Sequence, residues 1–228
     1  MIINNYSDWY NLTESTESPN AKHQTAIMFT DLVSSSKQWM GDHIGMSKWV
    51  DDHLTRVNNI VENHNGFIVK TIGDAMMVCF KGKNCLLNAV ESAEEILRTE
   101  KKKLRIGICQ GDIIEKTQRI QKSNLKDYFG NPVNTASRLE SKVSDEDGLS
   151  FAHLEDIDLH QSTELTEWLG KHKYEVIKYT DSPSKSKLGN VRKRSARLLS
   201  DLQISTHADI QELNGVNKVV AYKVKLNK

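Results

Sequence analysis

Two aspartates stand at the ends of predicted strands, where carboxylates can act together on a metal. Asp31 ends a short apolar run that begins at Thr25, and Asp74 shares with Gly73 the turn between two further apolar runs. Carboxylate oxygens suit Mg²⁺ or Mn²⁺, which keep bound waters and take further ligands from substrate phosphates. Two such ions at one site are the usual device for displacement at phosphorus. Taken singly, each aspartate is more often a helix cap or part of a plain turn.

A lysine lies four residues before Asp74, in a hairpin that otherwise has the composition of buried core. The segment is VKTIGDAMMVCF, from Val69 to Phe80, and the lysine is Lys70. Its two-residue Gly-Asp connection is typical of a β-hairpin. If the strand that ends at Asp31 lies beside this hairpin, the two carboxylates meet at one edge of the sheet. That arrangement would make the hairpin part of a site.

The predicted elements follow the order β, α, β, β, α, β, which is the ferredoxin-like arrangement of an α+β fold with helices on one face of the sheet. Helices are indicated by apolar residues at helical spacing, and strands by short apolar runs between turn residues. The polar segment 116–126 is predicted to be a loop. The predicted elements of residues 24–152, which begin with this βαββαβ order, are strand 25–31, helix 39–64, strands 67–72 and 75–80, helix 86–97, two strands around Gln110-Gly111, a helix within 130–143 and a short strand at 148–152.

The chain is predicted to form one domain with a tail. Residues 1–23 are polar and are expected to pack loosely, whereas residues 24–228 form the domain, with a core at 24–152. The periodic pattern weakens in the C-terminal extension 153–228, which contains a basic cluster at 185–197 and ends in a strand-like run. Three serines, Ser34 to Ser36, are candidates for capping the first helix.

Bulk composition narrows the class of protein. With 228 residues, 38% of them hydrophobic and 27% charged, the chain is expected to be a globular protein with a proper core. A formal charge of +1 points to no polyanionic partner. The three cysteines form no CxxC pair, so neither a disulfide framework nor a thiolate metal site is predicted. No apolar run is long enough for a membrane span and no signal peptide is evident, so a cytoplasmic location is expected.

Four segments of the chain resemble, in order, the signature segments of the class III nucleotidyl cyclases. They are FTDLVSSS, VKTIGDAMM, LRIGICQGDI and DYFGNPVNTASRLES. Four ordered motifs make a specific signal, whereas any one alone is weak. The resemblance covers roughly residues 23–152, with a fainter match at the C-terminus. It implies a catalytic domain that converts a nucleoside triphosphate to a 3′,5′-cyclic nucleotide and pyrophosphate.

The resemblance also implies roles for individual residues. It makes Asp31 and Asp74 the ligands of two divalent cations, Mn²⁺ or Mg²⁺. It assigns the binding of the terminal phosphates to backbone amides at the start of a helix. These amides belong to Leu32, Val33, Ser34, Ser35 and Ser36. Arg105 matches the arginine that contacts the triphosphate, Asn134 the amide that orients the ribose, and Arg138 the arginine that stabilises the transition state.

The resemblance further implies a homodimer. In this family the metal side and the Asn/Arg side of each site come from different subunits. This chain carries both sides, so two copies are expected to form two equivalent sites.

The nucleobase is less clearly specified than the reaction. Lys70 and Asp127 match the positions that read the base, and the pair resembles the adenylate type more than the glutamate/cysteine guanylate type. A donor beside an acceptor fits adenine N1 and N6, uracil O4 and N3, and cytosine N3 and N4. The pair therefore argues mildly against guanine and leaves adenine and the pyrimidines open.

The chain departs from the family near its C-terminus. The family usually has an LKG segment whose lysine contacts the triphosphate, but this chain has Asn214 there. Lys185, Lys187 and Lys218 are candidate substitutes, although a solvated surface role is the simpler reading of each. A nucleic-acid site in the cluster 185–197 is not favoured, because the cluster lacks interleaved aromatic residues.

No sensor, receiver or membrane domain is recognised in the chain. A compact cyclase with a divergent tail resembles the pyrimidine cyclases of the Pycsar anti-phage systems, which make cyclic UMP or cyclic CMP for a separate effector. The preferred prediction is therefore a pyrimidine nucleotide cyclase. An adenylate cyclase is the alternative, and an inactive cyclase-like dimerisation module is a remote one.

Overall fold

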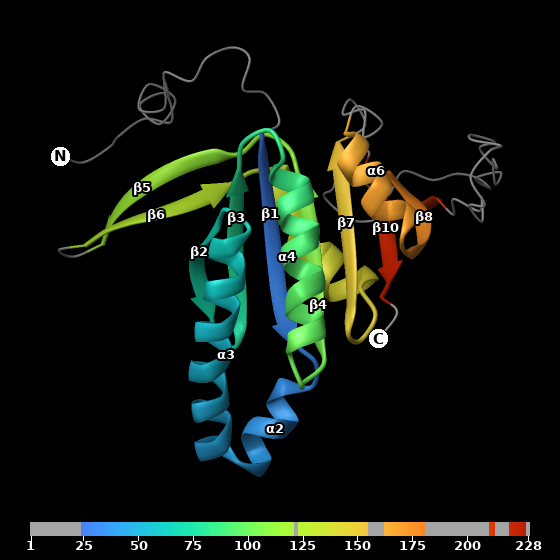
Figure 1. Cartoon of the computed structure of the whole chain (residues 1–228). Helices are drawn as coiled ribbons and strands as arrows, with labels where there is room; N and C mark the ends of the chain where they lie inside the picture. The colour runs from blue at the N-terminus through green and yellow to red at the C-terminus, as the bar shows by residue number, and fades with distance from the viewer. Residues whose placement is uncertain (1–23, 121–122, 155–161, 181–209, 213–218, 227–228) are drawn as a thin grey trace, which may run out of the picture.

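The computed structural model describes residues 24–120, 123–154, 162–180, 210–212 and 219–226. They form an eight-stranded sheet in the order β2-β3-β1-β4-β7-β10-β8-β9 and a separate two-stranded ribbon, β5-β6 (Figure 1). The predictions made for the tail 1–23, for the basic cluster 185–197 and for Asn214 and Lys218 lie outside the described residues.

The first half of the sheet is the predicted ferredoxin-like core. The strands β2, β3, β1 and β4 lie in that order, and each pair of neighbours is antiparallel. This arrangement confirms the α+β fold and places β1 beside β3, as the two-aspartate hypothesis requires. The elements are β1 (Thr25–Leu32), α2 (Ser35–Gly41), α3 (His43–Asn63), β2 (Gly66–Ile72), β3 (Ala75–Lys81), α4 (Cys85–Thr99) and β4 (Leu104–Gln110).

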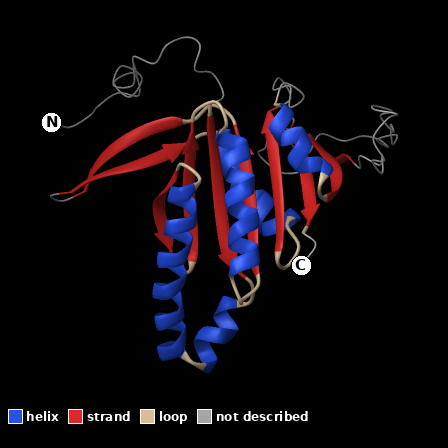
Figure 2. Cartoon of the chain, viewed as in Figure 1, coloured by secondary structure: helices blue, strands red, loops and turns tan. Residues whose placement is uncertain are grey.

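Alternate residues of the central strands enter two different cores. Met28, Val78 and Ile106 belong to the larger core, which also contains buried residues of α3 and α4. Ile27 and Cys109 belong to a smaller core on the opposite face, with residues of α5 (Asn131–Arg138) and of the π-helix η1 (Leu139–Val143). Figure 2 shows helices on both sides of the sheet. The prediction of helices on one face therefore holds for α3 and α4, whereas α5 covers the other face.

The polar segment predicted to be a loop is instead a β-ribbon. Strands β5 (Ile114–Ile120) and β6 (Ser123–Phe129) pair antiparallel and project from the body of the molecule, as Figure 1 shows. We call this ribbon the arm. The prediction was wrong because both faces of the ribbon carry polar residues, so the sequence shows no hydrophobic alternation.

The described part of the C-terminal extension continues the same sheet. β7 (Gly148–Leu154) runs parallel to β4, and β10 (Val219–Lys225) lies between β7 and β8. The strand-like end of the chain is thus a strand. The remaining elements are α6 (Thr163–Gly170), β8 (Lys173–Thr180) and β9 (Ile210–Glu212). Within the described ranges, no helix is both long and apolar enough to cross a membrane.

Candidate active site

Asp31 and Arg105 form a hydrogen-bonded ion pair. They face each other across the antiparallel pair of β1 and β4. Arg105 Nη2 donates a hydrogen bond of 2.7 Å to Asp31 Oδ2. About 30% of each side chain is exposed, so the pair is reachable from solvent. The predicted metal ligand and the predicted triphosphate contact therefore share one bond in this structure.

Asp74 lies at the same end of the sheet, one strand away from Asp31. It follows Gly73, whose φ of 65° is the left-handed conformation that the tight turn between β2 and β3 requires. The register of β1 and β3 sets Thr30 opposite Met76, which brings the end of β1 beside this turn. Asp74 is only 8% exposed, and its Oδ2 is buried without a hydrogen-bond partner.

An unpartnered carboxylate oxygen in a buried position is costly unless a cation or a donor reaches it. A divalent cation at Asp74 and Asp31 would supply that partner, so these two residues fit the oxygen-rich ligand set of Mg²⁺ or Mn²⁺. In the described ranges, no group of three or more His, Cys, Asp or Glu side chains could hold a metal ion. The remaining ligands would have to be backbone carbonyls, waters and phosphate oxygens.

Glu140 joins this end of the site and was missed by sequence reasoning. It lies in η1, is 8% exposed, and places Oε1 3.3 Å from Arg105 Nε. This contact is an ion pair without an aligned hydrogen bond, since neither atom has a hydrogen-bond partner. Burial raises the pKa of the Glu140 carboxyl to about 7; the charge of Asp31 acts in the same direction and that of Arg105 opposes it. The sequence held no local signal for this contact, because it depends on packing between segments that are distant in sequence.

The predicted phosphate-binding segment is held by its own chain at one point. Val33 N–H donates to the Lys103 carbonyl at 2.9 Å, and Gln38 Nε2 donates to the Val33 carbonyl at 3.1 Å. The amide of Val33 is therefore already engaged. Ser34 is the N-cap residue of α2 but makes no side-chain cap hydrogen bond, and its φ is 59°. A left-handed backbone at a residue other than glycine is strained, which is common in segments that bind ligands.

Lys70 and Asp127, the predicted base-reading residues, lie together. Lys70 Nζ donates to both carboxylate oxygens of Asp127, at 2.8 and 2.7 Å. The N–H of Tyr128 adds a bond of 2.9 Å to Asp127 Oδ1. Lys70 follows an irregularity in the pairing of β2 and β3 after Ile68, a feature that commonly redirects a side chain.

A second group of ion pairs fixes the root of the arm close to this pair. Glu115 of β5 accepts from Lys81 and Lys126 at 2.7 Å each, and from the Tyr128 hydroxyl at 3.0 Å. Hydrogen bonds from Lys126 and Lys81 lower the pKa of the Glu115 carboxyl to about 2. The arm that carries Asp127 is thus tied to β3 by charged contacts.

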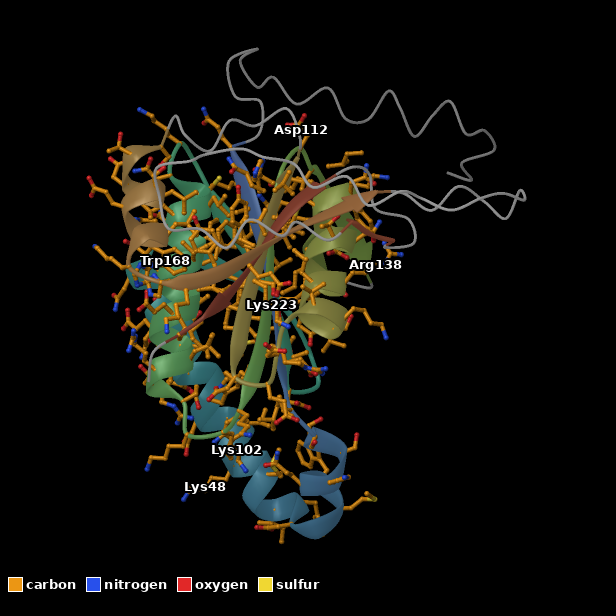
Figure 3. The ribbon with its side chains drawn as sticks, turned by 90° about the vertical axis from the view of Figure 1, so that its right-hand side faces the viewer. Lys48, Lys102, Asp112, Arg138, Trp168 and Lys223 are labelled. Carbon is orange, nitrogen blue, oxygen red and sulfur yellow. The ribbon has the colours of Figure 1, made fainter. Side chains whose placement is uncertain are left out.

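Asn134 and Arg138 belong to α5. Pro132, Thr135 and Ala136 face the sheet and are buried. Asn134 is exposed and Arg138 is half-buried at the end of the helix. In Figure 3, Arg138 and Trp168 of α6 lie on opposite sides of the sheet. The exposed amide of Asn134 is accessible to a ligand or to a second subunit.

Comparison with known proteins points to one family. Residues 17–149 match the family model described as the adenylate and guanylate cyclase catalytic domain. The fold is also similar to the guanylate cyclase domain of RhGC from Catenaria anguillulae, solved in complex with GTP. That match has a TM-score of 0.60 and 17% identity, and covers 91% of this chain and 99% of that chain.

Two curated relatives are named as adenylate cyclases. The chain is 34% identical over 70 residues to the receptor-type adenylate cyclase GRESAG 4.2 of Trypanosoma brucei brucei, which covers 31% of this chain. It is 30% identical over 141 residues to the adenylate cyclase of Schizosaccharomyces pombe, which covers 51% of this chain. The matches span only 12% and 8% of the lengths of these relatives.

Proposed function

This chain belongs to the family of adenylate and guanylate cyclase catalytic domains, and from that premise we propose that it converts a nucleoside triphosphate to a 3′,5′-cyclic nucleotide and pyrophosphate. The observation that carries the proposal is the buried, unpartnered Oδ2 of Asp74 beside the end of the strand that bears Asp31. An inactive cyclase-like module has no need to retain so costly a carboxylate.

Each charged residue of the proposed site has one task. Asp31 and Asp74 hold two divalent cations, Mn²⁺ or Mg²⁺. When bound, these ions supply activation of the ribose 3′-hydroxyl and neutralisation of the triphosphate. Arg105, once released from Asp31, presents its guanidinium to the triphosphate, for which its planar set of donors is well suited.

The segment 32–36 binds the terminal phosphates in this proposal. Because the amide of Val33 already donates to Lys103, the contacts fall mainly to Ser34, Ser35 and Ser36 at the start of α2. Lys185, Lys187 and Lys218 are the candidates to supply the triphosphate contact that the lysine of the LKG segment makes in the family.

The active form in this proposal is a homodimer. Asn134 orients the ribose and Arg138 meets the charge that develops on the phosphoryl oxygens, both acting on a nucleotide held by the metal residues of the partner subunit. The exposure of Asn134 supports this assignment, because its amide is accessible to a second copy of the chain. Two-fold pairing would give two equivalent sites.

The proposed substrate is a pyrimidine nucleotide, UTP or CTP. Lys70 and Asp127 form an adjacent donor and acceptor, which fits the edge of uracil or of cytosine. Contrary to the sequence-based expectation, hydrogen bonding alone does not disfavour guanine, because guanine O6 and N1 present the same pattern as uracil O4 and N3. GTP therefore belongs in every assay. Incubation of the purified chain with Mn²⁺ and each of the four nucleoside triphosphates tests both levels of the proposal. Cyclic UMP or cyclic CMP is expected, and no cyclic product from any of the four would refute cyclase activity.

Adenylate cyclase activity is the second candidate, and a specific observation favours it. Both curated relatives carry that name, and a lysine beside an aspartate also fits adenine. Formation of cyclic AMP alone in the same assay would replace the pyrimidine proposal with this one.

We further propose that the product is a second messenger for a separate effector in Pycsar-type anti-phage defence. The support is the resemblance of the chain to the pyrimidine cyclases of those systems. Expression of the chain in a phage-challenged bacterial host, together with the genes that flank its own gene, tests this role. Protection is expected for the wild type, and equal protection by Asp74→Ala would refute a role for the cyclic product.

The division of the chain remains a prediction. We propose one cyclase domain at 24–228, with its core at 24–152 and a divergent extension at 153–228, preceded by the tail 1–23. Limited proteolysis with mass spectrometry tests it, because a compact domain resists cleavage and a loosely packed tail does not.

A further inference from the structure

Arg105 is held between two carboxylates, of which only one belongs to the predicted metal pair. Its Nη2 donates to Asp31 at 2.7 Å, and its Nε lies 3.3 Å from Glu140 Oε1. A divalent cation that binds Asp31 competes with Arg105 for the same oxygen. After that competition, Glu140 is the carboxylate that still holds Arg105 in place.

The backbone of Glu140 is fixed against the strand that carries Arg105. Gly107 of β4 has no Cβ, and one added there would lie 2.2 Å from the backbone nitrogen of Glu140 and 2.2 Å from the carbonyl oxygen of Ala136. Only glycine permits this close approach of helix to strand. Ser144 adds a hydrogen bond of 2.6 Å from its hydroxyl to the Ile106 carbonyl.

The conformation of this segment is itself unusual. The chain changes from α-helix to π-helix at Leu139, and the amide of Ser144 closes the π-turn on the Leu139 carbonyl at 2.8 Å. Short π-helical stretches occur frequently at functional sites. Here the change of helix type accompanies the placement of Glu140 beside Arg105.

Glu140 is a poor choice for stability alone. Its side chain is buried, and its Oε1 has no aligned hydrogen bond. A buried carboxyl group that is incompletely satisfied costs free energy that an apolar residue of similar volume would not. A role in the site gives a reason for its presence.

We propose that Glu140 is a positioning residue, which retains Arg105 and thereby leaves Asp31 available to a divalent cation. This inference rests on the proposed cyclase function, because it assumes that Asp31 is a metal ligand. With Glu140 present, the guanidinium keeps one carboxylate partner after a cation takes the other. Without it, Asp31 is the sole carboxylate that the described contacts leave to Arg105.

Binding of Mn²⁺ to the nucleotide-free chain, followed by electron paramagnetic resonance or calorimetry, tests the proposal. Glu140→Gln removes the charge, whereas Glu140→Asp keeps the charge but shortens the side chain. Residues that orient metal-site groups typically contribute about 10-fold or more to affinity, so both variants are expected to weaken Mn²⁺ binding by about that factor. Glu146→Gln is the matched control, because Glu146 is an exposed carboxylate paired with Lys103.

The same variants are then compared in steady-state kinetics. A mispositioned Arg105 is expected to raise KM for the nucleotide more than it lowers kcat, and Glu146→Gln is expected to change neither. Near-ultraviolet circular dichroism and thermal melting verify that each variant is folded. Glu140→Asp keeps the test informative if the glutamine variant does not fold.

Three outcomes are distinguishable. Unchanged Mn²⁺ affinity in a folded Glu140 variant would overturn the positioning role while leaving the cyclase proposal intact. Full affinity in Glu140→Asp with loss in Glu140→Gln would also overturn it, because charge alone would then explain the effect. A wild-type chain that neither binds Mn²⁺ nor forms a cyclic nucleotide would instead refute the proposed function.

Discussion

The two groups of charged residues in the candidate site differ in how fully their atoms are satisfied. In the proposed metal-binding group, Asp74 Oδ2 has no partner and Arg105 is shared between two carboxylates. In the proposed base-reading group, Lys70 and Asp127 satisfy each other through two short hydrogen bonds, and the Tyr128 amide adds a third.

This difference shows what each group specifies about its ligand. A buried oxygen without a partner calls for a cation, so the metal-binding group defines the class of its ligand and hence of the reaction. Lys70 and Asp127 already bond each other and need no further partner, and their donor and acceptor groups are compatible with several bases. The reaction type is accordingly the better supported part of the proposal.

The largest effect is expected from removal of the unsatisfied carboxylate. Asp74→Ala should lower cyclic nucleotide formation by about 10³-fold or more, because metal-bound charge stabilisation provides several kcal/mol. The melting temperature should be unchanged or higher, since an uncompensated buried carboxylate disappears. The control is Asp51→Asn on the exposed side of α3. An active Asp74→Ala enzyme would contradict the contrast between the two groups.

Mixing two inactive variants tests whether the site spans two subunits. Asp74→Ala and Arg138→Ala should each be nearly inactive, yet mixed dimers contain one site with both residues intact. Random pairing predicts recovery of about a quarter of wild-type activity, because half of the dimers are mixed and each has one of two sites. Activity that stays at the level of the separate variants after subunit exchange would show that one chain supplies the whole site.

A smaller and more selective effect is expected in the base-reading group. Lys70→Ala or Asp127→Asn should lower activity by about 10- to 100-fold, as expected for lost polar contacts to a substrate. The ratio of rates among UTP, CTP, ATP and GTP should also change. Lys101→Ala, in an exposed stretch of the chain, is the matched control. An equal loss with all four nucleotides would mean that the pair does not read the base.

The smallest effect concerns the ion pairs that hold the arm. The pKa of Glu115 is lowered to about 2 in the folded chain, below its ordinary value near 4.5. Its stabilising contribution is therefore full above about pH 4.5 and is lost as the pH falls toward 2. The difference in unfolding free energy between wild type and Glu115→Gln should shrink across that range in denaturant titrations. A difference independent of pH there would argue against charged contacts at the root of the arm.

The sequence predicted the helices and strands of the core correctly, because hydrophobic periodicity and turn residues determine these elements locally. The order of strands then implied that the strand bearing Asp31 lies beside the hairpin whose turn carries Asp74, and the pairing of β1 with β3 confirms this placement. The assignment of Lys70 and Asp127 to one place came from family resemblance, since 57 positions separate them along the chain. Their roles, like those of Asn134 and Arg138, remain predictions.

Two features of the structure could not be predicted from the sequence, and the reasons are physical. The arm has polar residues on both faces, so no burial pattern marks its strands. Glu140 reaches Arg105 because the backbone of η1 approaches Gly107 at a distance that only a glycine allows. Such a contact depends on tertiary packing between segments distant in sequence, so no local sequence pattern predicts it.

The junction of α5 and η1 carries a consequence for a two-site enzyme. In the proposed homodimer, Arg138 at the end of α5 serves the partner's nucleotide, whereas Glu140, two residues later, serves the metal residues of its own subunit. One continuous helical segment would thus contact both sites of the dimer. We expect the two turnovers to be cooperative, with substrate saturation curves that depart from a hyperbola in wild type and approach one in Glu140→Gln.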